Sequence, residues 1–177
     1  MLFRQTLAAI LLCATTLTLA PAVNANAAAR PSQKPRAKAQ TPAPQTEITK
    51  EKIDVIVKAM HEAAKAKNVN GIAPYLAPDM KFISRGEGRP NLYVTRAQYL
   101  ASLRLVFEQV LDYTYLLKSL NITIAPDGQS ATVESEVFEM LTFAQGTVAA
   151  SVVGTTTFKI YKGKILISAM DGTVTRV

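Results

Sequence analysis

The fold of this chain is decided by residues 68–79, which read NVNGIAPYLAPD. Asn68 or Asn70 can accept a backbone hydrogen bond at the start of a short helix. Pro78 ends that helix, because proline does not continue the helical ladder. Residues 80–84, which read MKFIS, then predict a brief strand. This stretch therefore marks the passage from a helical part of the chain into a sheet.

Helices are predicted on both sides of this stretch. Apolar side chains recur at spacings of three and four over residues 53–64, behind Thr49 as an N-cap, and form one apolar face. Further along, Thr95 and Gln98 form a capping-box pattern for a helix that ends near residue 112. The residues expected to be buried in this last helix are Tyr99, Leu100, Leu103, Phe107, Val110 and Leu111.

Beyond residue 112, apolar residues alternate with polar ones, which is typical of strands. Strands are predicted at residues 113–125, 130–143, 148–161 and 164–176, with glycine-containing turns between them. A loop is predicted at 85–91. The fold class is therefore α+β, with three helical segments packed on one face of a strongly curved antiparallel sheet.

The sequence does not decide which side of the strand at 130–143 faces the helices, because both alternating sets of residues include apolar side chains. One set is apolar and consists of Ala131, Val133, Val137, Leu141 and Phe143. The other set is mixed and includes Glu134, Glu136, Phe138 and Met140. A strand that is covered on both sides explains this pattern, and so does a bulge that exchanges the faces partway along.

Two passages carry a family resemblance. Residues 68–79 are one, and the hairpin FKIYKGKI at residues 158–165 is the other. With the element order over residues 48–177, they resemble the nuclear transport factor 2-like superfamily, which includes SnoaL-like cyclases and ketosteroid isomerases. The resemblance implies a cone-shaped fold around a small-molecule pocket. It does not assign an activity, since one fold hosts many functions.

The catalytic residues of the ketosteroid isomerases have no counterparts in this sequence. The resemblance would place the oxyanion-donating phenol near Met60, the general-base aspartate near Ser84 and the protonated aspartate near Thr156. A thioether and two hydroxyls supply neither the base nor the donors that proton abstraction beside a carbonyl requires. No catalytic residue is therefore assigned.

The resemblance implies a mainly apolar pocket, for which the sequence supplies candidates. We expect it to be lined by Met60, Tyr99, Leu103, Phe107, Glu136, Phe138, Met140, Thr156 and Met170. A carboxylate there is costly unless it is paired or protonated, so Glu136 either orients a ligand's polar group or faces outward. A basic rim that attracts anionic ligands would consist of Arg85, Arg89 and Arg96.

These features predict an exported protein that binds a small apolar or amphipathic ligand without chemistry. Two other hypotheses stay open: a SnoaL-like enzyme that uses a carboxylate such as Glu136 or Asp79, and a module whose sheet face docks an envelope protein. A homodimer is also expected, in which a second copy of the chain covers the same sheet face. His61 lies at the edge of its helix's apolar face and is expected to be a partly solvated surface residue.

Composition excludes several kinds of site. Cys13 and His61 are the only cysteine and histidine, so one chain cannot form a multi-cysteine or multi-histidine metal site, and no metal or other cofactor is expected. The net charge is +7, but residues 47–177 carry 15 basic and 13 acidic side chains. Nucleic acid is therefore not an expected partner.

The N-terminal residues predict a targeting sequence followed by a disordered tether. Residues 1–27 combine a basic start, a short apolar run and an Ala-Asn-Ala cleavage site, which is typical of a secretory signal peptide. Residues 28–46 are basic and rich in proline, and they lack large apolar side chains, which predicts a disordered tether. Its charge suits contact with anionic envelope surfaces. One domain is expected over residues 47–177, in the periplasm or outside the cell.

We predict that the exported protein begins near Ala28, because small residues at Ala25 and Ala27 suit cleavage by a signal peptidase. Intact-mass measurement of the exported protein should give the mass of the chain without residues 1–27. A mass that retains those residues contradicts the prediction.

Overall fold

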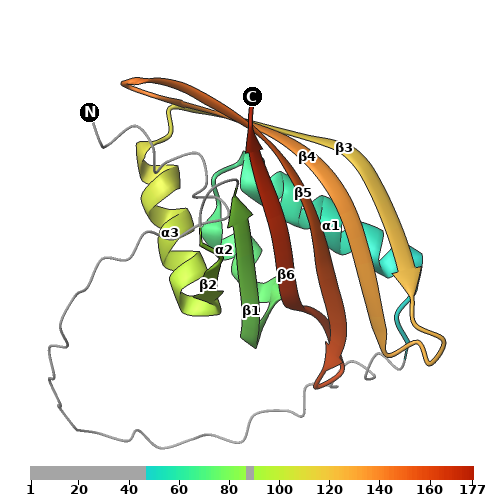
Figure 1. Cartoon of the computed structure of the whole chain (residues 1–177). Helices are drawn as coiled ribbons and strands as arrows, with labels where there is room; N and C mark the ends of the chain where they lie inside the picture. The colour runs from blue at the N-terminus through green and yellow to red at the C-terminus, as the bar shows by residue number, and fades with distance from the viewer. Residues whose placement is uncertain (1–46, 87–89) are drawn as a thin grey trace, which may run out of the picture.

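The computed structural model describes residues 47–86 and 90–177, in which three α-helices lie against a six-stranded sheet (Figure 1). The predicted signal peptide, the predicted tether and Arg89 lie outside the described residues. The helices are α1 (Lys50–Lys65), α2 (Val69–Ile72) and α3 (Arg96–Gln109), and a 3-10 turn, η2 (Ala73–Tyr75), follows α2. The strands are β1 (Leu76–Gly86), β2 (Leu92–Thr95), β3 (Asp112–Ile124), β4 (Ser130–Phe143), β5 (Gly146–Tyr161) and β6 (Lys164–Arg176).

The α+β class is confirmed, while the expected form of the sheet is corrected. The strand order is β2-β1-β6-β5-β4-β3, and the sheet is mixed because β1 runs parallel to β6. The sheet is also not strongly curled (Figure 1). The pairing of β4 with β5 runs from Ser130 to Phe143 without a register shift. An antiparallel sheet was expected because the alternation of residues along a strand does not show which strand lies beside it or in which direction that strand runs.

The predicted caps form at both long helices. Thr49 accepts a hydrogen bond from the Lys52 amide at the start of α1, and Thr95 forms the full capping box with Gln98 at the start of α3. Helix α3 ends at Gln109, earlier than predicted, and Val110 already has an extended backbone. Leu111 is therefore 67% exposed instead of buried.

Residues 68–79 turn the chain from helix to strand, as their sequence predicts. Asn68 caps α2 by accepting a hydrogen bond from the Gly71 amide at 3.0 Å. A Cβ on Gly71 would lie 3.0 Å from the Cβ of Ala63, so glycine lets α2 approach α1 closely. Strand β1 begins at Leu76, earlier than the predicted residue 80, and its register beside β6 is interrupted before Lys81.

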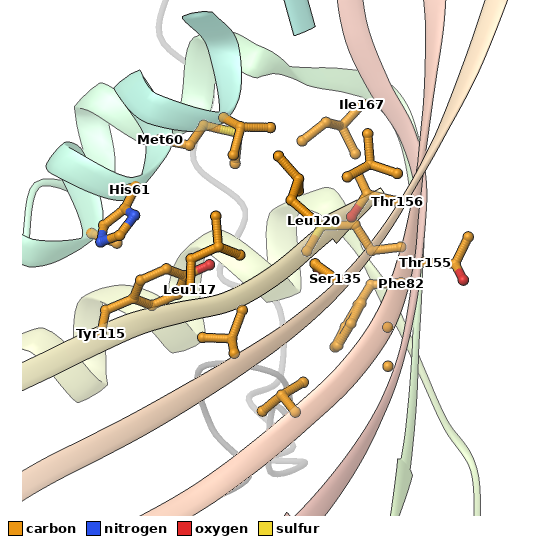
Figure 2. Close-up of a pocket in the computed structure, with 18 of the residues that line it drawn as sticks. Met60, His61, Phe82, Tyr115, Leu117, Leu120, Ser135, Thr155, Thr156 and Ile167 are labelled. Atoms are coloured by element: carbon orange, nitrogen blue, oxygen red, sulfur yellow. The ribbon is translucent and has the colours of Figure 1, made fainter. Parts of the chain in front are cut away.

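A β-bulge lies in β3 and not in β4. The pairing of β3 with β4 shifts between Leu117 and Ser119, which leaves Lys118 as the extra residue. Tyr115 and Leu117 before the bulge, and Leu120 after it, consequently all face the helices (Figure 2). The bulge exchanges the two sets of positions along β3, whereas β4 keeps a single alternation throughout.

Among the described residues, no helix is long and apolar enough to cross a membrane. The core lies between the helices and one face of the sheet, which we call the inner face. Its most buried side chains include Ile53, Phe82, Leu103, Leu141 and Phe158.

We predict that Leu103→Ala lowers the free energy of unfolding by about 2–5 kcal/mol, because Leu103 of α3 is fully buried and its removal leaves a cavity. Leu105→Ala on the same helix is the matched control. Leu105 is 57% exposed, so this change should stay within about 0.5 kcal/mol. Urea unfolding measures both, and equal losses would contradict the packing described here.

Candidate functional site

A cavity of about 160 Å³ lies between α1 and the inner face of the sheet (Figure 2). Its wall is mainly apolar, with Val57, Met60, Phe82, Leu117 and Val133 among the lining residues. The lining residues with polar side chains are His61, Tyr99, Tyr115, Ser135, Glu139, Thr155, Thr156 and Asp171. Such a wall, mostly apolar with a few polar groups, is the usual form of a small-molecule site.

Two carboxylate residues line this cavity: Asp171, which forms an ion pair with Arg85, and the deeply buried Glu139. Glu139 lies on β4 in phase with Val137 and Leu141 and is only 4% exposed. The Tyr113 hydroxyl donates a hydrogen bond to Glu139 Oε1 at 3.0 Å, while Glu139 Oε2 is buried and has no hydrogen-bond partner among the described residues. Burial raises the pKa of Glu139 to about 7, although the bond from Tyr113 opposes this rise.

His61 and Tyr115 stand together at one end of the cavity (Figure 2). Their ring centroids are 4.4 Å apart, and Tyr115 lies directly opposite Glu139 on the neighbouring strand. His61 is half-buried, in agreement with its expected place at the edge of the apolar face, but its Nε2 is buried without a hydrogen-bond partner in residues 47–86 and 90–177. Burial, and then the charge of Glu139, raises the pKa of Tyr115 above its ordinary value.

The structure brings four of the nine predicted lining residues to the cavity: Met60, Tyr99, Thr156 and Met170. Leu103 and Phe107 do not line it, because they pack in the core beneath α3, where the Phe107 ring contacts Tyr113. Glu136, Phe138 and Met140 lie on the opposite, outer face of β4. The reason is the unbroken alternation of β4, which turns the odd-numbered residues to the cavity.

On the outer face, Glu136 belongs to a surface cluster. Lys118 Nζ lies 3.1 Å from Glu136 Oε1, and the Ser151 hydroxyl donates to the same oxygen at 3.3 Å. The Lys118 ammonium also lies 5.7 Å from the centre of the Phe138 ring. Glu136 therefore cannot orient a ligand in the cavity.

Two of the three residues of the predicted basic rim are described, Arg85 and Arg96, while Arg89 lies outside the described residues. Arg85 makes a bidentate ion pair with Asp171, with N···O distances of 2.7 and 2.8 Å. Arg96 donates to the backbone oxygens of Leu76 and Ala73 and so holds the turn before β1 in place. Both guanidinium groups are thus engaged in structural contacts. Asp79, the other carboxylate considered, is exposed and outside the cavity wall.

Glu139 is the functional candidate that the sequence analysis missed, and a signal for it exists. It occupies the same alternating positions as Ala131, Val133, Val137 and Leu141, so it is a charged residue within an apolar set. No group of three His, Cys, Asp or Glu side chains in the described part of the chain could hold a metal ion.

The helix-covered sheet, with its cavity between the two layers, defines the nuclear transport factor 2-like fold. Residues 53–163 match the family model of the SnoaL-like domain, and the chain belongs to this family. No curated protein matches the chain.

Solved structures with this fold come from several bacteria. A hexachlorocyclohexane dehydrochlorinase from Novosphingobium barchaimii is 14% identical, with a TM-score of 0.57, over 72% of this chain and 88% of its own. A ketosteroid isomerase-like protein from Erwinia carotovora atroseptica is 18% identical, with a TM-score of 0.53, over 70% and 94%. A conserved protein from Planctomyces limnophilus is 14% identical, with a TM-score of 0.59, over 72% and 96%. These likenesses establish the fold alone.

We predict that Glu139→Gln stabilises the protein at pH 8 and not at pH 5. The unfolded chain releases the Glu139 proton near pH 4.5 but the folded protein holds it until about pH 7, so wild-type stability falls as the pH rises through this window. The glutamine keeps an oxygen for the bond from Tyr113 but does not ionise. It should therefore avoid a loss in the free energy of unfolding on the order of 3 kcal/mol at pH 8.

Urea unfolding at both pH values measures this difference. Glu136→Gln is the matched control, since it removes a partly exposed ion pair and should change stability by no more than about 0.5 kcal/mol at either pH. An equal effect of Glu139→Gln at pH 5 and pH 8 would show that Glu139 is not buried as described.

Proposed function

We propose that the protein binds a small, mainly apolar and uncharged molecule in the cavity, and that Glu139 holds the molecule's polar group. The observation that carries this proposal is that Glu139 lines a mainly apolar cavity and that its buried Oε2 has no hydrogen-bond partner among the described residues. A buried polar atom without a partner costs about 1–3 kcal/mol. A ligand that supplies the missing hydrogen bond recovers this free energy on binding.

The chemistry of the wall supports an uncharged ligand. An anion would lie beside Glu139, whose raised pKa already reflects how poorly this site solvates negative charge. Arg85 and Arg96 are engaged with Asp171 and with backbone oxygens and offer an anion no compensation. The apolar side chains from α1 and the sheet suit a hydrocarbon body. Export, the homodimer and contact between residues 28–46 and anionic surfaces stay predictions.

Native mass spectrometry of protein purified from its own cells tests this function. We expect a small neutral compound to be released from the wild-type protein, and Glu139→Leu to carry much less of it because the polar contact is lost. Glu136→Leu, on the outer face, is the control and should retain the compound. Equal occupancy in both variants, or a wild-type protein that never carries a compound, contradicts the proposal.

A second candidate function is proton transfer to or from the bound molecule. A carboxyl group with a pKa of about 7 and an unpartnered oxygen is suited to act as a general base or acid near neutral pH. His61 lines the same cavity and has a free ring nitrogen within the described part of the chain. One protein of the same fold is a hexachlorocyclohexane dehydrochlorinase. Turnover of the co-purified compound by the wild type, and its loss in Glu139→Gln with binding retained, would favour catalysis over binding alone.

A further inference from the structure

Part of the cavity wall is formed by small residues of three adjacent strands. Ser135 on β4 pairs with Gly154 on β5, and Gly154 pairs with Gly172 on β6. All three residues line the cavity, and we call this row the floor. It lies on the inner face because its neighbours two positions away, Val133 and Val137, also line the cavity.

The floor is a hollow bounded by larger side chains. One neighbouring row contains Val133, Thr156 and Met170, and the other contains Val137 and Val152. The rows stand two residues to either side of the floor, so they are roughly 13 Å apart along the strands. Between the two rows, the floor consists of backbone and the side chain of Ser135. The floor is therefore flat.

Glycine at position 154 also has a structural reason. A Cβ there would lie 2.8 Å from the backbone oxygen of Asp171, so close packing of β5 on β6 excludes a side chain. Glycine itself therefore does not indicate a ligand. The second and independent sign of a ligand is Glu139, which is 96% buried and whose Oε2 has no partner in the described structure.

We infer that the ligand is a compact hydroxyl compound built on one flat ring, which lies on the floor with its hydroxyl against Glu139. This inference rests on the proposed binding function and adds the size, shape and polar group of the ligand. The cavity of about 160 Å³ is close in size to an engineered cavity of about 150 Å³ that binds benzene in another protein. One substituted ring suits a cavity of this size.

The choice of a hydroxyl follows from the two forms of Glu139. Oε1 accepts the bond from Tyr113, so the proton of the neutral acid belongs on Oε2, where it donates to a ligand. When Glu139 is ionised, the same Oε2 accepts a bond instead. A hydroxyl group both donates and accepts, so it satisfies either form, whereas a carbonyl or an ammonium group satisfies only one.

Four probes test the inference on the mature protein: phenol, toluene, benzoate and 2-naphthol. Met60 and Met170 line the cavity, so methyl NMR of the methionines reports binding at the site. We expect phenol to shift both signals, toluene to bind at least tenfold more weakly, and benzoate and 2-naphthol to bind more weakly still. Tighter binding of 2-naphthol than of phenol would overturn the inference and leave the proposed function standing, whereas tighter binding of the anion benzoate would overturn both. No shift with any probe at millimolar concentration would overturn both.

Two variants then locate the ring and the hydroxyl. Ser135→Leu fills the floor and should weaken phenol binding at least tenfold, while Ser119→Leu, on the exposed outer face of β3, should leave it unchanged. Glu139→Leu should reduce phenol binding to the level of toluene and leave toluene binding intact, which also shows that the variant is folded. Equal effects of the two serine substitutions, or a parallel loss of phenol and toluene in Glu139→Leu, would contradict this placement.

Discussion

The register of β4 is the constraint on which the rest of the site depends. Side chains alternate along a strand, so a slip of one residue would turn every side chain of β4 to the other face. The pairing with β5 runs without a shift from Ser130 to Phe143, which fixes one alternation over the whole strand. That alternation places Glu139 in the cavity and leaves Glu136 on the outer face with Lys118. The bulge at Lys118 then keeps Leu120 facing the helices beyond it.

The burial of Glu139 opposes the stability of the fold. A leucine at this position would fill the same space without the desolvation that raises the pKa of the carboxyl group. Tyr113 relieves only part of this penalty, because its hydroxyl reaches Oε1 and not Oε2. Natural proteins concentrate such local conflicts at functional sites. The costly burial of Glu139 is therefore a stronger argument for a ligand than the apolar lining of the cavity. Apolar side chains line the interior of any folded domain.

Local signals in the sequence predict most of this fold. Thr49 and Thr95 start their helices because their side chains meet free amides within three residues, and this requires no knowledge of the rest of the chain. The long strands follow in the same way from alternation. The parallel pairing of β1 with β6 was not predicted, because it joins residues that are far apart in the sequence. Leu111 was misplaced because the end of α3 depends on where β3 enters the sheet, and β3 begins at Asp112.

The site was predicted less well than the fold. The expected facing of Glu136, Phe138 and Met140 followed from the family resemblance and not from the alternation of side chains along β4. The resemblance to ketosteroid isomerases directs attention to Ser84 on β1, which is buried but carries no base. In this chain the carboxyl group stands on β4, and β6 and β5 separate that strand from β1. The buried carboxyl group of the cavity thus lies on a different strand from the one to which the resemblance directs attention. A ligand held by Glu139 would therefore meet its hydrogen-bonding partner beside Tyr115 and His61, and not beside Ser84 on β1.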